Sequence, residues 1–349
     1  MPRALVLGGT GATGRAIARR LRPAGWDVVL AGRDPGRMPA DLAAAGTRFV
    51  AADRSDLGTP AEPAGLAGQT DLLVDCLCFG AADAAGLLPL ARRSACTVMI
   101  SAKAVYADDA GRHASSAEPP DFGGPVTESQ ATLPPGDQSY PNGKVAAERL
   151  LDSGLPVTVL RPGLIHGEGA RQPREWIFVK RALDRRPRVL LAHRGAGVNQ
   201  TTAAANLAAL IEVVAGRPGQ RILNAADPDP PSARQISRTV AGYLGHERDE
   251  VLLDGSASET GRLPWDVPHP VVLDTAAATA LGYRPAGDYA ATVSAEVDWL
   301  VRAAAGGPEA DLVQGLEQEF WPLLDYAAED RYLERRGGPG GVLPPGRHR

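Results

Sequence analysis

Short apolar runs alternate with helix-like stretches through the first half of the chain. Five runs that suit strands occur in order: one ending at Leu7, then Trp26–Ala31, Thr47–Ala52, Asp71–Cys78 and Thr97–Ser101. The fourth run is mostly apolar, which is typical of a parallel strand covered on both faces. Strands that alternate with helices in this way predict an α/β fold of the Rossmann type, a doubly wound parallel sheet with right-handed crossovers.

The second half of the chain has weaker strand signals and more helices. Residues 156–163 predict a sixth strand and a turn, and short strands are expected at 188–191 and 221–224. Helices are expected to open at 173–176, with proline at the first position, to start near 201, and to span 232–244, 275–281, 290–303 and 312–333. Proline-rich connections separate the later helices. Together these helices predict a smaller, mostly helical C-terminal substrate domain.

These elements predict two domains and a tail. The dinucleotide-binding domain is expected at 1–165, with returning segments near 188–226, and the substrate-binding or lid region at 166–187 and 227–336. The tail, 337–349, is rich in glycine and proline and is expected to be disordered. The loop 108–138 is too long for a plain connection, which favours a lid or an active-site loop.

The first strand runs into a glycine-rich turn and then into a helix. Three glycines have the spacing GxxGxxG, which permits a tight turn and brings backbone N–H groups close to a pyrophosphate. The helix N-terminus attracts the negative charge of the phosphates. The turn therefore predicts a dinucleotide site. Its predicted contacts are Gly8, Thr10, Gly11, Ala12, Thr13 and Gly14.

The exit of the second strand bears on which dinucleotide is bound. An acidic residue here would bind the ribose hydroxyls of NAD(H), whereas an arginine favours the 2′-phosphate of NADP(H). The strand ends at Gly32 and Arg33 follows, with Arg37 one turn further, so the sequence favours NADP(H). NAD(H) is the alternative, with Asp34 on the ribose. Further cofactor contacts are expected at the ends of neighbouring strands, with Asp53 near the adenine amino group: Asp53, Arg54, Cys78 and Pro162.

Composition limits the class of protein and of partner. The chain has 349 residues, 44% of them hydrophobic, and a formal net charge of -4, and its arginines are interspersed with acidic residues. Without a basic stripe, nucleic acid is not favoured as a partner. The absence of a signal peptide and of a membrane-spanning run leads us to expect a cytoplasmic protein without membrane contact. Cys76, Cys78 and Cys96 are expected to be reduced, buried thiols, and no metal site is predicted.

The helix that follows the long loop carries a tyrosine and a lysine four residues apart. Tyr140 and Lys144 fall on one face of this helix, so their side chains can converge on one spot. The sequence contains three lysines, Lys103, Lys144 and Lys180, so this spacing has a low probability by chance. Tyr140 and Lys144 are therefore candidate catalytic residues.

Four motifs occur in the order in which a known family has them. They are the N-terminal GxxGxxG, the strand end Ser101–Tyr106, the pair Tyr140 and Lys144, and the turn Arg161–Pro162. Over about residues 1–303 the chain thus resembles the extended short-chain dehydrogenase/reductase family, in its NAD(P)-dependent epimerase/dehydratase group. The resemblance implies that Tyr140 exchanges a proton with a substrate carbonyl or hydroxyl while hydride moves to or from a nicotinamide. It also implies that Lys144 holds the nicotinamide ribose and favours the phenolate.

Two positions depart from the family pattern. Where the family usually has a catalytic serine or threonine, this chain has Ala102. Ser101 is the candidate replacement, although a one-residue step along a strand reverses the side-chain direction; Lys103 or a bound water is the alternative. The asparagine and arginine typical of sugar-nucleotide members are missing at 163–166 and 197–200, so a nucleotide sugar is less favoured as substrate.

The sequence as a whole favours an enzyme of biosynthesis. We expect an NADP(H)-dependent ketoreductase or dehydrogenase that acts on a carbonyl or secondary alcohol of a small, partly apolar metabolite. One alternative is an epimerase or dehydratase that retains its cofactor, and another is a non-catalytic relative that senses nucleotides or associates with RNA. The expected partners are a small-molecule substrate and, by analogy with the family, a second copy of the chain.

Overall fold

The structure, a computed structural model, describes residues 1–57, 59, 62–150, 153–255 and 260–336. The predicted tail at 337–349 lies outside the described residues. The chain divides into two compact units. The first consists of Met1–Pro173, Val198–Pro231 and Val267–Trp299, and the second of Arg174–Gly197, Ser232–Asp266 and the chain from Leu300 onward.

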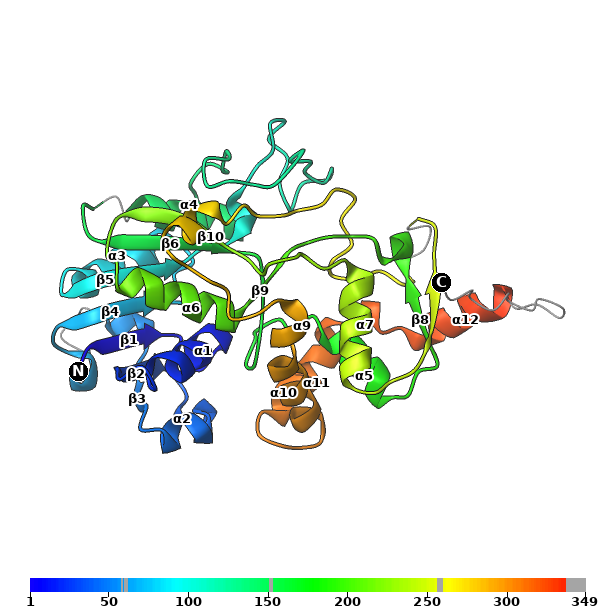
Figure 1. Ribbon diagram of the computed structural model, residues 1–349, viewed down its shortest axis with the longest axis horizontal. Coiled ribbons are helices and arrows are strands. Elements are labelled where there is room, and N and C mark those ends of the chain that lie inside the picture. Colours follow the sequence, from blue (N-terminus) through cyan, green and yellow to red (C-terminus); the bar gives the residue numbers. More distant parts are fainter. Residues whose placement is uncertain (58, 60–61, 151–152, 256–259, 337–349) are drawn as a thin grey trace. The chain divides into compact units, whose positions relative to one another are not determined.

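A seven-stranded parallel sheet forms the centre of the first unit (Figure 1). Its strands are β1 (Arg3–Leu7), β2 (Asp27–Gly32), β3 (Arg48–Ala51), β4 (Thr70–Asp75), β5 (Ser94–Ile100), β6 (Val157–Pro162) and β10 (Arg221–Ala225). They lie in the order β10-β6-β5-β4-β1-β2-β3, and all neighbours are parallel. The predicted doubly wound sheet is therefore confirmed. The strand order reverses between β1 and β4, so a ligand crevice is expected there, at the carboxyl ends of the strands.

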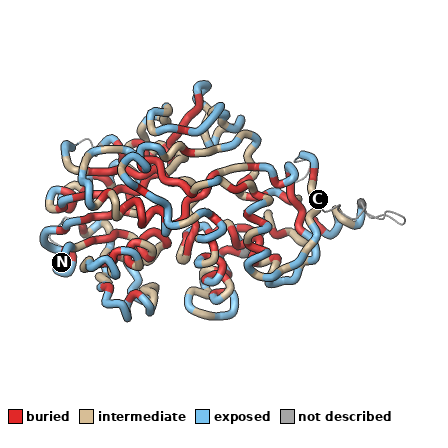
Figure 2. The backbone as a smooth tube through the Cα atoms, viewed as in Figure 1, coloured by how far each residue is buried: buried red, intermediate tan, exposed pale blue. Residues whose placement is uncertain are grey.

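Helices cover both faces of this sheet. Apolar residues of β1 alternate in direction, so Val6 packs with the helices of one face and Leu5 with those of the other. The first face carries α1 (Ala12–Leu21), α2 (Ala40–Ala44), α6 (Ala204–Ala215) and α8 (Ala276–Ala280). The second face carries α3 (Ala81–Ala91) and α4 (Tyr140–Leu150). The strands β1, β2, β4, β5 and β6 are buried along most of their length, as expected for a sheet covered on both faces, whereas the edge strand β3 is exposed or half-buried (Figure 2).

Shorter elements complete the first unit. Strand β7 (Leu164–His166) pairs in parallel with β9 (Thr201–Ala203). The helix expected from residue 201 therefore starts three residues later, as α6, because the β-branched Thr201 and Thr202 join this pairing. The predicted helix at 290–303 is present as α9 (Tyr289–Thr292) and α10 (Ser294–Ala304), of which the residues up to Trp299 belong to this unit.

The second unit is mostly helical. Its helices are α5 (Trp176–Leu183), α7 (Ala233–Tyr243), α11 (Ala310–Glu319) and α12 (Tyr326–Arg336). The single helix expected at 312–333 is wrong, because the chain leaves the helix near Pro322 and proline cannot continue one. Strand β8 (Arg188–Leu191), expected with the dinucleotide domain, pairs instead with β11 (Asp249–Leu252) in a sheet of its own. A four-residue apolar run does not specify its partner strand.

Candidate active site

The turn between β1 and α1 is shaped by glycine. Gly8 has a φ of +81°, in the left-handed region that glycine adopts readily. A Cβ on Gly14 would lie 2.5 Å from the Cα of Gly9, so α1 starts in direct contact with the turn, with Thr13 buried. A Cβ on Gly11 would meet the Gly8 carbonyl oxygen at 3.6 Å and otherwise enter open space. The turn therefore fits a pyrophosphate, which must approach the backbone closely.

The loop after β7 covers part of this turn. The Ala12 N–H, expected to face a phosphate, donates instead to the carbonyl oxygen of Gly169 at 3.1 Å. Glu168 of the same loop binds the buried Arg15, with 3.0 Å between Oε1 and Nη1. Nε of Arg15 also donates to the carbonyl oxygen of Thr10 at 2.7 Å. Arg15 thus ties the glycine turn to the loop that follows β7, and the Ala12 amide is occupied within the protein.

Arg33 is exposed at the exit of β2. Asp34, the alternative ligand for the ribose, uses its carboxylate within the protein: Oδ1 accepts from the Gly36 N–H at 2.8 Å and caps the short helix Pro35–Arg37. Its Oδ2 lies 3.5 Å from Nε of Arg37. Arg33 is thus the first exposed charge after β2, and the Asp34 carboxylate, which is exposed as well, is already engaged by the Gly36 N–H.

Asp53 and Arg54 follow β3, and their side chains have different surroundings. The exposed Asp53 carboxylate accepts from the Ser55 hydroxyl and N–H, at 2.7 and 2.9 Å, and this hydroxyl lowers the pKa of Asp53. Arg54 binds both oxygens of the buried Asp75, at 2.7 and 2.6 Å, and Oδ1 of Asp83 at 3.1 Å. The Arg54 guanidinium therefore joins β4 to α3, and its predicted contact with the cofactor gains no support from this geometry.

The pair Tyr140 and Lys144 lies on one face of α4, as the spacing predicts. Nζ of Lys144 lies 5.6 Å from the centroid of the Tyr140 ring. Lys144 is 2% exposed, and its Nζ donates to the carbonyl oxygens of Cys78 and Ile100, at 2.7 and 2.8 Å. Burial lowers the pKa of Lys144 from its ordinary 10.5. A buried cation thus lies beside a tyrosine that is 51% exposed, next to the carboxyl ends of β4 and β5.

The Ser101 hydroxyl belongs to a buried network. Its hydroxyl donates to Glu148 on α4, and Glu148 forms a two-pronged ion pair with Arg161 of β6, at 2.6 and 3.1 Å. All three side chains are buried. Glu148 lies two helical turns from Tyr140, about 12 Å along the axis. A one-residue step from position 102 to position 101 reverses the side-chain direction, in agreement with this engagement. The predicted catalytic role of Ser101 gains no support from this geometry.

Lys103, one alternative to Ser101, and Pro162 both lie at or just after the carboxyl end of a strand of the sheet. Lys103 donates from Nζ to the Asn199 side chain and to the carbonyl oxygen of Gln200, the latter at 3.0 Å. Pro162, a predicted cofactor contact, is buried as the last residue of β6, in register with Ala225 of β10. Both residues therefore lie at the edge of the sheet where the ligand is expected, but Lys103 is already bound to the segment before β9.

The thiols agree with the expectation from the sequence. The three cysteines are free, with Cys78 and Cys96 buried and Cys76 partly buried. Burial raises the pKa of the Cys78 thiol to about 12. The Cys78 thiol is therefore protonated, and this residue contributes its backbone carbonyl to the site. No group of three or more metal-ligating side chains occurs in the part of the chain that the structure describes.

A buried carboxylate organises the start of the long loop. Oδ1 of Asp108 accepts from the backbone N–H groups of Ala110 and Arg112, at 3.0 and 2.8 Å. Its Oδ2 accepts from the Asp121 N–H at 3.0 Å and from Nε of Arg112 at 2.7 Å. Burial would raise the pKa of Asp108, but these hydrogen bonds lower it to about 2. This part of the predicted lid is therefore ordered around a negative charge.

Asp227 is a second buried carboxylate, which the sequence did not single out. It contacts Nε2 of His166 at 2.9 Å and accepts from Oγ1 of Thr201 at 2.7 Å. The Ala203 N–H and the Asn206 side chain bind its other oxygen, at 2.6 and 2.8 Å. Burial opposes ionisation, but the hydrogen bond with His166 and the others lower the pKa of Asp227. Its place in a proline-rich joint indicated only a turn.

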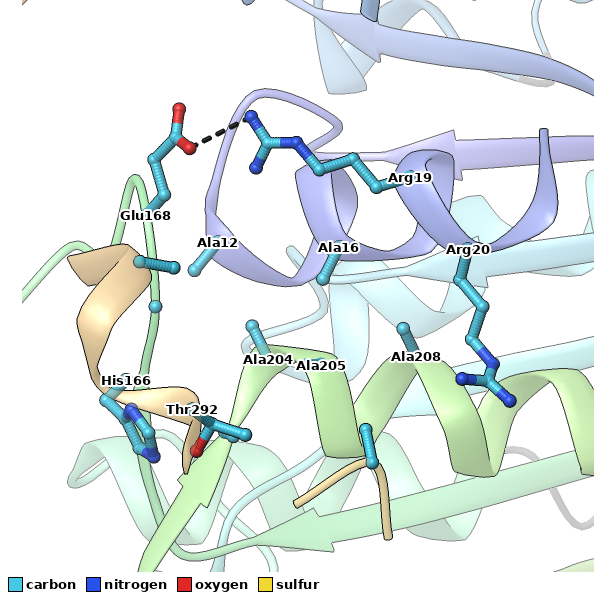
Figure 3. A pocket seen from close by; sticks show the side chains of 14 residues that line it. Ala12, Ala16, Arg19, Arg20, His166, Glu168, Ala204, Ala205, Ala208 and Thr292 are labelled. Carbon is cyan, nitrogen blue, oxygen red and sulfur yellow. Dashed lines mark ion pairs between the residues drawn. The ribbon is translucent and has the colours of Figure 1, made fainter. Parts of the chain in front are cut away.

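A cavity of about 300 Å³ lies on the α1 and α6 side of the sheet. Figure 3 shows the side chains that line it. Ala12 and Ala16 of α1 line it opposite Ala204 and Ala208 of α6. An ion pair between Glu168 and Arg19, 2.9 Å long, lies at its edge. Among the described residues that line the cavity, the tyrosine and lysine of α4 do not occur. The cavity is therefore separate from the candidate catalytic pair.

Throughout the described ranges, every helix is too short or too polar to span a bilayer.

Comparison with solved structures agrees with this architecture. UDP-glucuronic acid 4-epimerase from Bacillus cereus, solved with UDP-glucuronic acid and NAD, is 17% identical with a TM-score of 0.61, and the match covers 85% of this chain and 98% of that one. UDP-N-acetylglucosamine 4-epimerase from Methanobrevibacter ruminantium M1, in complex with UDP-N-acetylmuramic acid, is 16% identical with a TM-score of 0.65. The match covers 86% of this chain and 98% of that one. A putative epimerase from Burkholderia cenocepacia J2315 is 20% identical with a TM-score of 0.62, and the match covers 85% of this chain and 97% of that one. At such identities these likenesses show the fold.

The sequence itself carries the assignment to a family. No curated protein matches the chain significantly. Residues 4–225, well over half of the chain, match the NAD dependent epimerase/dehydratase family. This match includes the glycine turn, the pair on α4 and the end of β6. The chain therefore belongs to the NAD dependent epimerase/dehydratase family, whose members are enzymes of the extended short-chain dehydrogenase/reductase type.

Proposed function

We propose that this protein is an NADP(H)-dependent oxidoreductase that interconverts a carbonyl group and a secondary alcohol on a small, partly apolar metabolite. The proposal is carried by the exposed Tyr140 beside the buried Lys144 at the carboxyl edge of the sheet. A bound nicotinamide supplies or accepts the hydride. In the reductive direction the Tyr140 hydroxyl gives its proton to the carbonyl oxygen, and in the oxidative direction the Tyr140 oxygen takes the proton from the alcohol.

Lys144 supports this step in two ways. An ammonium has three N–H donors, and two of them bind the carbonyl oxygens of Cys78 and Ile100. A ribose hydroxyl fits the third donor. The positive charge is screened little by water because Lys144 is buried, so it stabilises negative charge on the Tyr140 oxygen.

The preference for NADP(H) rests on the exit of β2. Arg33 is exposed there, while the Asp34 carboxylate is bound to the Gly36 N–H. An arginine at this place favours a 2′-phosphate, and a carboxylate engaged in a cap is less suited to a ribose hydroxyl. The glycine turn would hold the pyrophosphate of the same cofactor.

The assignment of Tyr140 is tested by Tyr140→Phe, which removes one hydroxyl and keeps the ring. We expect kcat to fall by about 10²–10⁴-fold, measured as NADPH oxidation with a ketone substrate, while NADPH binding stays within about twofold. The matched control is Tyr243→Phe, a change at a tyrosine that is 48% exposed in the second unit. Equal turnover by Tyr140→Phe and the parent would refute proton transfer by Tyr140.

The cofactor preference is tested by Arg33→Asp. We expect the ratio of the Kd for NADPH to the Kd for NADH to rise by about tenfold or more, since a bidentate contact with a phosphate is exchanged for a repulsion. Arg217→Asp makes the same charge change at another exposed arginine and should leave the ratio unchanged. An unaltered ratio in Arg33→Asp would remove Arg33 from the cofactor site.

Membership of the family favours a second function, an epimerase or dehydratase that retains its cofactor. Such an enzyme returns the hydride within each turnover, so it consumes no NADPH. Two of the solved epimerases described above are in complex with UDP-linked ligands. In this chain, however, His166 is buried against Asp227, in the segment that lacks the asparagine of sugar-nucleotide members. Incubation with UDP-glucuronic acid and a trace of NAD⁺, followed by chromatography, distinguishes the two functions: a new sugar nucleotide without net reduction would favour this one.

A further inference from the structure

Two large hydrophobic side chains that stay exposed are neighbours at the candidate site. Phe79 is 40% exposed and Tyr140 is 51% exposed. Their ring centroids are 6.3 Å apart and their planes are inclined by 47°, a tilted arrangement that aromatic pairs favour. Phe79 follows β4, at the strand end that borders the expected ligand crevice. Apolar surface left open beside a reactive group is typical of a binding site.

The backbone fixes Phe79 against α4. Its N–H donates to Oδ2 of Asp83 at 2.7 Å, at the start of α3. The carbonyl oxygen of the preceding residue, Cys78, accepts from Lys144. On α4, a Cβ on Gly143 would lie 2.5 Å from the Phe79 carbonyl oxygen, so glycine lets the helix and this segment touch. The position of Phe79 relative to Tyr140 is therefore held by both neighbouring helices, as in a preorganised site.

The cation of Lys144 lies close to both rings. Its Nζ is 4.6 Å from the centroid of Phe79 and 5.6 Å from that of Tyr140, within the range of cation–π attraction. Part of each ring thus covers the buried ammonium, and the rest of each ring is open to solvent. The open part is apolar and gains free energy when a ligand removes it from water.

We propose that Phe79 is a specificity-determining residue, and that the rings of Phe79 and Tyr140 form an aromatic wall that binds an apolar group next to the reacting carbonyl. This inference rests on the proposed function. It narrows the substrate class to ketones and secondary alcohols with an aromatic or aliphatic substituent beside the reacting carbon. A polyhydroxylated substrate gains little from such a wall, because its surface is already well hydrated.

The wall is tested with Phe79→Ala, Phe79→Leu and two ketones of opposite polarity, acetophenone and dihydroxyacetone. With NADPH as reductant, Phe79→Ala should lower kcat/KM for acetophenone by about tenfold or more and that for dihydroxyacetone by less than about twofold. Phe79→Leu should retain an intermediate value for acetophenone. Ile222→Ala is the matched control, because Ile222 is 36% exposed near the amino end of β10. Equal losses for both ketones, or no loss for acetophenone, would overturn the proposal.

A binding measurement separates this inference from the proposed function. Saturation-transfer difference NMR on the whole protein without cofactor should show transfer to the ring protons of acetophenone, and Phe79→Ala should abolish it. Turnover of neither ketone by a wild-type protein that binds NADPH would reject the proposed function. In that case loss of the NMR signal in Phe79→Ala still supports the aromatic wall, whereas equal signals in the two proteins refute it. Melting curves establish that both variants are folded.

Discussion

Removing one partner of the buried ion pair between Arg161 and Glu148 should destabilise the first unit by several kcal/mol. The two side chains are 4% and 6% exposed, and two charge-assisted hydrogen bonds join them. Arg161→Met removes both bonds and leaves the carboxylate buried. At about 1.5–3 kcal/mol per bond to a charged group, we expect a loss of about 3–5 kcal/mol, the range typical of removing one partner from a buried pair.

Urea denaturation followed by circular dichroism measures this loss. The matched control is Arg48→Met, the same substitution in the same unit at an arginine that is 50% exposed and lies 2.5 Å from Asp27. Exposed pairs contribute about 0.2–1 kcal/mol, because water screens them and both side chains lose freedom. The two variants should therefore differ by at least about 2 kcal/mol.

A double variant tests whether the unpaired buried carboxylate causes the loss. Arg161→Met combined with Glu148→Leu replaces the pair by apolar groups and leaves no buried charge, so it should be more stable than Arg161→Met alone. Ser101 then loses its acceptor, which limits the recovery. If Arg161→Met costs no more than Arg48→Met, or if the double variant is no more stable than Arg161→Met, then burial of the carboxylate is not the source of the loss.

Three further variants test the turn, the loop and the cation. Gly14→Ala should lower the free energy of unfolding by about 1–3 kcal/mol or more, because the added methyl group overlaps the glycine turn. Gly86→Ala is the control, since Gly86 lies in α3 with open space around it, and it should raise the free energy of unfolding by about 0.5–1 kcal/mol in the same thermal melt. The Asp108 carboxylate has a pKa of about 2, below its ordinary 3.8, so its contribution is complete above the ordinary value and is lost as the pH falls towards 2. Hydrogen exchange of the loop amides should follow this loss in the wild type, and Asp108→Asn should lack the protection already at neutral pH. Lys144→Met should weaken NADPH binding by about tenfold in calorimetry, while Lys180→Met, a change at a lysine whose side chain is 25% exposed, should not; equal affinities would refute the contact with the ribose.

Local spacing predicted the parts of the protein that depend on neighbours in the chain. The interval from Tyr140 to Lys144 places both side chains on one face of a helix in any fold, and the structure has this helix. The glycine spacing encodes the contact between Gly14 and Gly9 in the same way. Alternation of strands and helices was enough to predict the doubly wound sheet, because parallel strands need crossover helices.

The positions that sequence reasoning missed depend on partners far away in the chain. Arg54 binds Asp75, which lies 21 positions further along the chain. Ser101 binds Glu148, which lies 47 positions further along. A charge that follows a strand can face a cofactor or a carboxylate, and the pattern of apolar residues does not distinguish these cases. Glu148 did leave a signal, since it lies four residues beyond Lys144 on the same helical face. Phe79 is likewise an aromatic residue that directly follows the strand expected at Asp71–Cys78.

Lys144 also affects how relatives of this protein should be interpreted. Its ammonium spans the carbonyl oxygens of two adjacent strand exits, so a shorter or uncharged side chain would orphan both acceptors inside the protein. A relative that had lost catalytic activity would therefore still need a lysine at this position for the stability of its fold. Tyr140, one turn earlier, is half exposed and does not bridge two strand ends in this way. Its presence is therefore the better indicator that a relative is still catalytically active.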